Sequence, residues 1–376
     1  RAVRAGAETI VSEVRDGGDA AVRDAAARFG GGVPDGSLRI PAAQLFAAAE
    51  GLDEALRNAL VAATRAIRTV HEPQRPRDHV VEPVVGVRVE RAWAPLRRVG
   101  VYVPGGLAAY PSSVMMSVIP AQVAGVAEIA IASPAGPGGG ISDALLAAAA
   151  MLNVDEVYAV GGAQAVAALA YGTETIPRVD KIVGPGNAWV TAAKLAVFGD
   201  VGIDLPAGPS EALELVDGTA NPRAVAADLI SQAEHGPDSV AVLVSPDEGM
   251  VDAVLAQVAE LLPRLERSEI IAASLERHGL AVVAPTIEEA LAFANAFAPE
   301  HLSIQTADPQ AHAAAVPSAG SVFLGHWSPH SAGDYATGAN HVLPTGGLAR
   351  AYGPLSVEDF GSWRQVQALT RRGLAS

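Results

Sequence analysis

Two side chains that can bind a metal stand three residues apart in the segment Ser-Gln-Ala-Glu-His-Gly-Pro at 231–237. Gln232 and His235 would share one face of a helix, because positions i and i+3 are neighbours on a helix surface. The preceding residues predict that helix, since Asn221 suits its N-cap, Pro222 suits its first turn, and the Gly-Pro pair ends it. The ordinary alternative is that the two side chains only form a polar end to an apolar helix.

A carboxylate and an imidazole are adjacent at Glu300 and His301, directly before a predicted strand. Histidine changes its charge near neutral pH and is therefore a natural general base, and a neighbouring glutamate can activate water. The pair could serve an acid–base reaction. A dipeptide that faces solvent from a loop is the alternative interpretation.

The glycine-rich segment 331–345 carries one carboxylate, one amide and one imidazole, at Asp334, Asn340 and His341. These groups could converge on one small ligand. Together with the Gln-His pair described above they supply oxygen and nitrogen donors of the kind that Zn²⁺ accepts. Surface loops are commonly polar, however, and the sequence does not show that this segment folds beside the Gln-His helix.

Three predicted strands run into glycine turns that open helices. Such turns let backbone N–H groups approach an anion or a polar ligand closely. None of them matches the GxGxxG dinucleotide pattern, and each alone could be an ordinary strand-to-helix turn. Three within about 85 residues favour a ligand crevice at the carboxyl ends of the strands. The turns are Tyr-Val-Pro-Gly-Gly at 102–106, Val-Gly-Gly-Ala-Gln at 160–164 and Val-Gly-Pro-Gly-Asn at 183–187.

The composition is that of a compact globular chain with an acidic surface. Half of the 376 residues are hydrophobic and 18% are charged, and the length predicts two or three domains. A net charge of −15 argues against nucleic acid or an anionic membrane as the main partner. Cysteine is absent, so any metal must bind to nitrogen and oxygen, and a cytoplasmic location is compatible. We find no signal peptide and no unbroken apolar span of about 20 residues.

The hydrophobic pattern changes along the chain and predicts an α/β fold. Residues 1–70 carry apolar side chains at helical spacing, interrupted by a glycine-rich turn at 30–36. Beyond residue 81, short β-branched runs begin to alternate with helical stretches, which is typical of βα units on parallel sheets. We predict strands near residues 99–103, 128–132, 156–160, 181–183, 211–216, 240–244, 281–283, 302–305 and 321–324.

Seven sequence blocks resemble the signature blocks of the histidinol dehydrogenase family. They occur in the family's order and extend over essentially the whole chain, which makes the resemblance far more specific than any single motif. The blocks lie at 101–106 with 110–113, 160–165, 180–187, 206–211, 231–235, 299–301, and 333–335 with 340–345.

The resemblance implies two incomplete Rossmann-like parallel-sheet domains with an N-terminal helical extension and a C-terminal helical tail. It also implies a zinc-dependent, NAD-linked, four-electron oxidation of L-histidinol to L-histidine through histidinaldehyde. On this basis we expect the helical extension at 1–80, the NAD-side domain at 81–215, a domain with the metal and acid–base residues at 216–345, and the start of the tail at 346–376.

The family pattern further implies roles for individual residues. His301 would be the general base and Glu300 would activate water. Zinc would be bound by Gln232, His235 and Asp334. These three ligands would also contact the substrate, together with Ser210, His301 and His341, and NAD would contact Tyr102, Gln164 and Asn187.

Family members continue with a helical tail that carries a substrate-binding glutamate and the histidine that completes the zinc site. In the family's intertwined homodimer this tail serves the neighbouring subunit, so we expect a homodimer with tail exchange. Two alternatives stay open. The chain could be a zinc- and NAD-dependent relative that oxidises another primary alcohol, such as sulfopropanediol, or a non-catalytic binding or assembly protein. The intact Glu300-His301 pair and Asp334 argue against the second.

Overall fold

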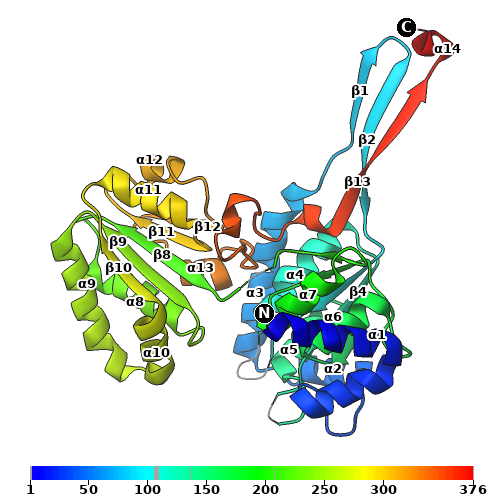
Figure 1. The fold of residues 1–376 in the computed structure, drawn as a ribbon, viewed down its shortest axis with the longest axis horizontal. Helices are drawn as coiled ribbons and strands as arrows, with labels where there is room; N and C mark the ends of the chain where they lie inside the picture. The colour runs from blue at the N-terminus through cyan, green and yellow to red at the C-terminus, as the bar shows by residue number, and fades with distance from the viewer. Residues whose placement is uncertain (1, 106–109, 137, 207, 376) are drawn as a thin grey trace. The chain divides into compact units, whose positions relative to one another are not determined.

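The computed structural model describes residues 2–105, 110–136, 138–206 and 208–375. Its contacts divide the chain into two units (Figure 1). Unit 1 contains Arg1–Asp204 and Leu355–Ser376, and unit 2 contains Leu205–Pro354. The expected α/β class is confirmed, because the described strands of each unit form a five-stranded parallel sheet. The division falls eleven residues before the expected boundary of 215/216, because the strand at 211–216 pairs only with strands of unit 2.

The sheet of unit 1 has the strand order β5-β4-β3-β6-β7. Its central strand β3 is buried at every position, as expected for a parallel strand covered on both faces. The strands are β3 (Arg98–Tyr102), β4 (Glu128–Ser133), β5 (Glu156–Ala159), β6 (Lys181–Val183) and β7 (Gly202–Ile203), and the helices between them are α4 (Pro111–Ala124), α5 (Asp143–Met151), α6 (Gly162–Tyr171) and α7 (Ala188–Val197).

The predicted helical lead-in is confirmed, and it packs onto the sheet-covering helices of unit 1. Helix α1 (Ala2–Phe29) contacts α6 and α7, helix α2 (Ala42–Glu50) contacts α5, and helix α3 (Glu54–His71) contacts α4. Ile10, Val14 and Val22 are buried along α1 at helical spacing. The lead-in is therefore part of the core of unit 1.

A second, antiparallel sheet of unit 1 has the order β1-β2-β13 among the described strands. It joins β1 (His79–Val84) and β2 (Val87–Pro95) to β13 (Gly361–Leu369), and α14 (Arg371–Leu374) follows. Figure 1 shows these strands as a narrow ribbon. The sequence indicated β-structure from residue 81 but did not predict β13, whose side chains are mostly exposed and give no clear apolar alternation.

The sheet of unit 2 has the order β10-β9-β8-β11-β12. All nine strands predicted for the two units are present, with ends within two residues of the prediction. The strands of unit 2 are β8 (Glu211–Val216), β9 (Val240–Ser245), β10 (Gly279–Val283), β11 (His301–Gln305) and β12 (Ser321–Leu324), and the helices are α8 (Pro222–Ala233), α9 (Glu248–Leu261), α10 (Ser268–His278), α11 (Ile287–Phe297), α12 (Pro309–Ala314) and α13 (His330–Tyr335).

The two faces of this sheet are covered by different helices, as the alternation along β9 shows. Val242 and Val244 pack with the core under α11, whereas Ala241 and Leu243 pack with the core under α8 and α9 (Figure 1). Short 3-10 turns complete the described chain at Glu72–Gln74, Leu262–Arg264, Leu348–Arg350 and Val357–Phe360. Among the described residues, no helix combines the length and the apolar composition that a membrane span needs.

Candidate active site

The predicted metal and acid–base residues of unit 2 lie at the amino ends of the central strand β8 and its neighbour β11. His301 is the first residue of β11, and it is in register with Ala212, the second residue of β8. Helix α8 runs antiparallel to these strands in a βα unit, so its C-terminal end, which carries Gln232, reaches the same edge. The predicted cap of α8 is confirmed, because the Asn221 side chain accepts hydrogen bonds from two backbone N–H groups of the first turn.

A buried carboxylate connects the loops before β8 and β11. Glu300 is only 7% exposed, and its Oε2 accepts hydrogen bonds from the Ser210 hydroxyl (2.7 Å) and the Glu211 backbone N–H (2.8 Å). Gln232 donates from Nε2 to the Ser210 hydroxyl oxygen at 3.1 Å, which extends the chain of contacts to α8. Burial raises the pKa of Glu300, against the opposing effects of His301 and the two hydrogen bonds.

His301 is held in an orientation that suits a base. Its Nδ1 lies 3.3 Å from the Glu211 carbonyl, and donation to this oxygen leaves the Nε2 lone pair available. Nε2 lies 3.8 Å from Asp334 Oδ1. Burial alone would lower the pKa of His301, but the interactions with Asp334 and Glu300 outweigh it and raise the pKa to about 9, so the two carboxylates favour the protonated ring at neutral pH.

The structure brings the predicted zinc ligands to this edge. Asp334 lies 3.8 Å from His301, and although burial would raise the pKa of Asp334, the interaction with His301 and the charges of His341 and His235 lower it. His235 hydrogen-bonds through Nδ1 to a backbone carbonyl one turn earlier, which leaves Nε2 for a ligand. Within the described chain, Gln232 Oε1 is buried without a hydrogen-bond partner.

These donors fit a zinc ion. An amide oxygen, an imidazole nitrogen and a carboxylate oxygen belong to the donor set that Zn²⁺ accepts, and leaving Gln232 Oε1 buried and unpaired has a free-energy cost that a bound cation would remove. The Nε2 atom of His341 is also buried and without a hydrogen-bond partner among the described residues. The predicted residues therefore form one polar cluster with unsatisfied acceptors.

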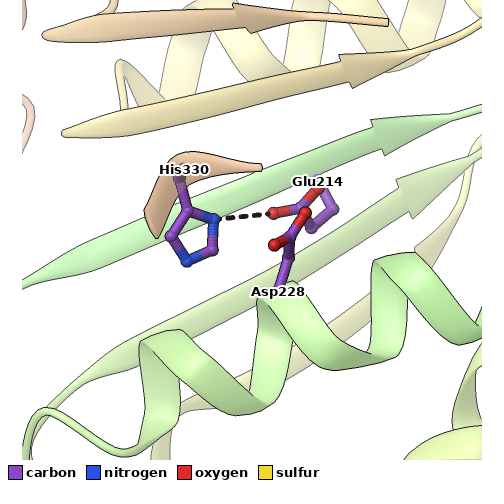
Figure 2. A group of neighbouring side chains, drawn as sticks. All are labelled: Glu214, Asp228 and His330. Atoms are coloured by element: carbon purple, nitrogen blue, oxygen red, sulfur yellow. Dashed lines mark ion pairs between the residues drawn. The ribbon is translucent and has the colours of Figure 1, made fainter. Parts of the chain in front are cut away.

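Sequence reasoning missed a second polar cluster, which contains Glu214 on β8, Asp228 on α8 and His330 on α13 (Figure 2). One ligand atom from each lies within 4.8 Å of the others, and all three residues are buried. His330 Nδ1 lies 3.4 Å from Glu214 Oε1, and the two imidazole rings of His330 and His301 have centroids 5.7 Å apart. The sequence indicated this cluster only through Glu214, a charged residue in the middle of the predicted strand 211–216.

The second cluster is neutralised by its own members. Burial and the charge of Glu214 raise the pKa of Asp228 to about 7. Burial would lower the pKa of His330, but Glu214 raises it above its usual range. Gln305 Nε2 lies 3.4 Å from an oxygen of each carboxylate. The cluster thus contains the His330–Glu214 ion pair, the partly protonated Asp228 carboxyl group and the amide donor of Gln305. Because these groups compensate one another's charge, the cluster attracts a cation less strongly.

The three predicted NAD contacts line one cleft of about 530 Å³ in unit 1. Tyr102, Gln164 and Asn187 stand at the carboxyl ends of β3, β5 and β6, where the glycine turns predicted a crevice. The Tyr102 hydroxyl accepts a hydrogen bond from the Gly162 N–H at 3.1 Å. At Gly161 a Cβ atom would collide with Pro134, so this position of the cleft requires glycine. Gly106 and Ala207, which belong to two of the quoted blocks, lie outside the described residues.

A family model described as histidinol dehydrogenase matches residues 1–376. The chain belongs to the histidinol dehydrogenase family. It is 50% identical over 368 residues to histidinol dehydrogenase of Natronomonas pharaonis, covering 98% of this chain and 86% of that protein. It is 47% identical over 365 residues to histidinol dehydrogenase of Methanothermobacter thermautotrophicus, and this match covers 97% of this chain and 85% of that protein. The crystal structure of histidinol dehydrogenase from Elizabethkingia anophelis superposes with a TM-score of 0.93 at 38% identity, covering 98% of this chain and 85% of that chain.

The predicted activity is confirmed by this membership. The chain is an NAD-dependent oxidoreductase that converts L-histidinol to L-histidine, and its family uses NAD and Zn²⁺. The two alternatives, a relative acting on another alcohol and a non-catalytic protein, are not favoured. A γ-glutamyl phosphate reductase from Thermotoga maritima, with a TM-score of 0.52 at 13% identity over 98% of this chain and 94% of that chain, shares the fold alone.

The buried Glu211 predicts a pH-dependent change in stability. Burial and the charge of Glu300 raise its pKa from 4.5 to about 7, so the folded state binds this proton more tightly than the unfolded state does. The free energy of unfolding should therefore fall as the pH rises from about 4.5 to 7, by about 3 kcal/mol from this group. Glu211→Gln keeps an acceptor for the Gly346 N–H but cannot ionise. Denaturant unfolding of both proteins should show the variant gaining relative stability across this window, and parallel pH profiles would contradict the assignment.

Proposed function

We propose that unit 2 carries the metal and the acid–base residues of histidinol oxidation and that unit 1 carries the NAD site. The supporting observation is the set of contacts that joins Glu300 to Ser210 and Gln232, beside His301 and Asp334. These five residues have the types and positions that the resemblance requires. In this assignment the domain expected to carry the metal corresponds to unit 2, and the NAD-side domain corresponds to unit 1.

Gln232, His235 and Asp334 would hold Zn²⁺, and His341 and Ser210 would contact the substrate. When bound there, Zn²⁺ would orient the imidazole and amine of histidinol, and its charge would favour the neutral form of the neighbouring His301. The expectation that both ligands share one helix face is wrong, because α8 ends at Ala233 and His235 follows in the turn after the C-cap residue Glu234. Gln232 lies in the last turn of this capped helix, only three residues before His235, and both still lie at the same end of α8.

In the first half-reaction His301 removes the alcohol proton. Its Nε2 would accept the proton of the substrate hydroxyl, and NAD bound in unit 1 would supply the acceptor for the hydride of the carbinol carbon, so that histidinaldehyde and NADH would result. The resulting imidazolium is stabilised by Asp334, 3.8 Å from Nε2, and by Glu300, 3.6 Å from Nδ1.

In the second half-reaction Glu300 activates water. Its carboxylate would take a proton from a water molecule as the water oxygen bonds to the aldehyde carbon, while the imidazolium of His301 would return its proton to the aldehyde oxygen. The hydrate would then lose a proton to the neutral His301 and a hydride to a second NAD, and the carboxylic acid formed would release its proton to solvent. The product is the carboxylate of histidine. The raised pKa of Glu300, caused by burial, makes its carboxylate a stronger base than an exposed one.

Two substitutions test this division of roles. Glu300→Gln should slow oxidation of histidinaldehyde more than oxidation of histidinol to the aldehyde, whereas His301→Asn should slow both, each by about 10²–10⁴ in rate. Single-turnover measurements of NADH formation from each substrate separate the two steps. Glu266→Gln makes the same chemical change at an exposed position of unit 2 and should leave both rates unchanged. Equal losses on both substrates in Glu300→Gln would contradict the hydration role.

We also propose that the enzyme is a homodimer in which a C-terminal tail from the partner completes each zinc site. Three candidate ligands leave one position of a tetrahedral site for a further group. The antiparallel sheet of unit 1 supports an interface between copies, because Val80, Val81, Val84, Val366 and Leu369 are all at least 40% exposed on it.

Light scattering of the enzyme with its C-terminal tail should therefore give about twice the mass of one chain. Val81→Asp with Val366→Asp places two charges on this exposed apolar surface and should shift the enzyme to monomers with loss of turnover, because the site loses the partner's group. Leu255→Asp, on the exposed side of α9 in unit 2, is the matched control and should stay dimeric. A double variant that is monomeric and fully active would refute the shared site.

A cytoplasmic location is the last part of the proposal. Each turnover consumes two NAD molecules, and the intracellular pool supplies this cofactor. The absence of cysteine from the sequence is compatible with a reducing compartment.

A further inference from the structure

A buried ion pair lies beside the NAD cleft of unit 1. It joins Lys194 on α7 to Asp204, which directly follows β7, and the two side chains are only 3% and 2% exposed. Asp204 is also the last residue of unit 1 before the chain enters unit 2. Neither residue lines the cleft, and neither belongs to the predicted site.

Both members of the pair bond to the same backbone residue. Asp204 Oδ2 accepts the Gly184 N–H at 2.7 Å, and Lys194 Nζ donates to the Gly184 carbonyl at 3.1 Å. Gly184 has a φ of +110°, and a Cβ there would collide with the Tyr102 carbonyl oxygen. The turn therefore has an unusual backbone conformation in close contact with β3, and the ion pair satisfies its polar groups.

This turn leads directly into the cleft. Gly184 begins the Gly-Pro-Gly-Asn segment, and Gly186 and Asn187 line the cleft. Asn187 Oδ1 accepts the backbone N–H groups of Trp189 and Val190 and thereby caps α7, the helix that also carries Lys194. The segment is held at its first residue by the ion pair and at its last residue by the helix cap.

Stability alone does not account for this arrangement. Burying two charges carries a desolvation cost that a buried ion pair often only offsets, so apolar residues of similar size would stabilise the fold equally well. Apolar side chains, however, could not bond to both polar groups of Gly184. The charged groups of Lys194 and Asp204 therefore fix the position of the Gly184 turn through these two hydrogen bonds.

We propose that Lys194 and Asp204 are positioning residues for NAD, which fix the Gly184 turn so that Gly186 and Asn187 present their groups to the dinucleotide. The inference rests on the proposed NAD site in this cleft. It assigns the pair no contact with NAD and no part in proton transfer.

The test measures NADH binding, by nicotinamide fluorescence, together with amide hydrogen exchange of segment 181–190 in the absence of nucleotide. Lys194→Met keeps most of the side-chain length and removes the charge and the donor. It should weaken NADH binding about tenfold or more, leave histidinol binding near its normal value, and speed exchange at the turn. Asp204→Asn keeps an oxygen acceptor for the Gly184 N–H and should give the same changes to a smaller extent. This second variant provides the test if Lys194→Met does not fold.

The matched control is Arg98→Met. Arg98 is also buried in unit 1 and bonded to two carboxylates, Glu128 at 3.0 Å and Glu156 at 2.5 Å, but these residues begin β3, β4 and β5 at the opposite edge of the sheet. This variant should lose stability, yet keep NADH affinity and the exchange rate of segment 181–190. If Lys194→Met weakens NADH binding no more than Arg98→Met does, the pair is merely structural.

Asn187→Ala separates this inference from the NAD assignment. A variant with unchanged NADH affinity would show that the cleft is not the NAD site, and the proposed function of unit 1 would then fail. Weaker binding in Asn187→Ala with normal binding in both Lys194→Met and Asp204→Asn would retain the NAD site and overturn the positioning role.

Discussion

The buried carboxylate of Glu300 is the contact on which the candidate active site depends. It bonds to the Ser210 hydroxyl and the Glu211 N–H, and Ser210 in turn receives a hydrogen bond from Gln232. One acceptor thereby fixes the loop before β8, the loop before β11 and the end of α8. A buried carboxylate needs such partners because its desolvation is costly. Burial makes Glu300 a stronger base, while the hydrogen bonds that hold the site together lower its pKa and favour its ionised form.

The two units place their functional residues at opposite ends of their strands. In unit 1 the glycine turns follow β3, β5 and β6, so the cleft lies at the carboxyl edge, as is usual for open parallel sheets. In unit 2 His301 opens β11, and the end of α8 reaches the same amino edge. Turns of exposed backbone N–H groups suit a dinucleotide, whereas a helix end and strand starts supply side-chain donors for a metal and acid–base groups.

Much of the fold could be predicted from the sequence because its signals are local. Asn221 and Pro222 define the start of α8, the Gly-Pro at 236–237 follows its last residue Ala233 by three residues, and short apolar runs define the nine predicted strands. The strand β13 could not be predicted in this way, since it is defined by pairing with β2, more than 260 residues earlier, and buries little. The boundary between the units could not be predicted either, because β8 belongs to unit 2 through its pairing with β9 and β11, and the composition does not change at this point. The cluster of Glu214, Asp228 and His330 lay outside prediction for the same reason: its members come from three elements and meet only in the folded sheet.

We infer that the cation binds at the amino edge of the unit 2 sheet and not in the buried cluster of Glu214, Asp228 and His330. The most direct measurement is anomalous X-ray scattering on both sides of the zinc absorption edge, from crystals of the zinc-loaded enzyme. We expect a zinc peak about 2.0–2.2 Å from Gln232 Oε1, a nitrogen of His235 and an oxygen of Asp334. A peak held by Glu214, Asp228 and His330, with none at the predicted ligands, would contradict it.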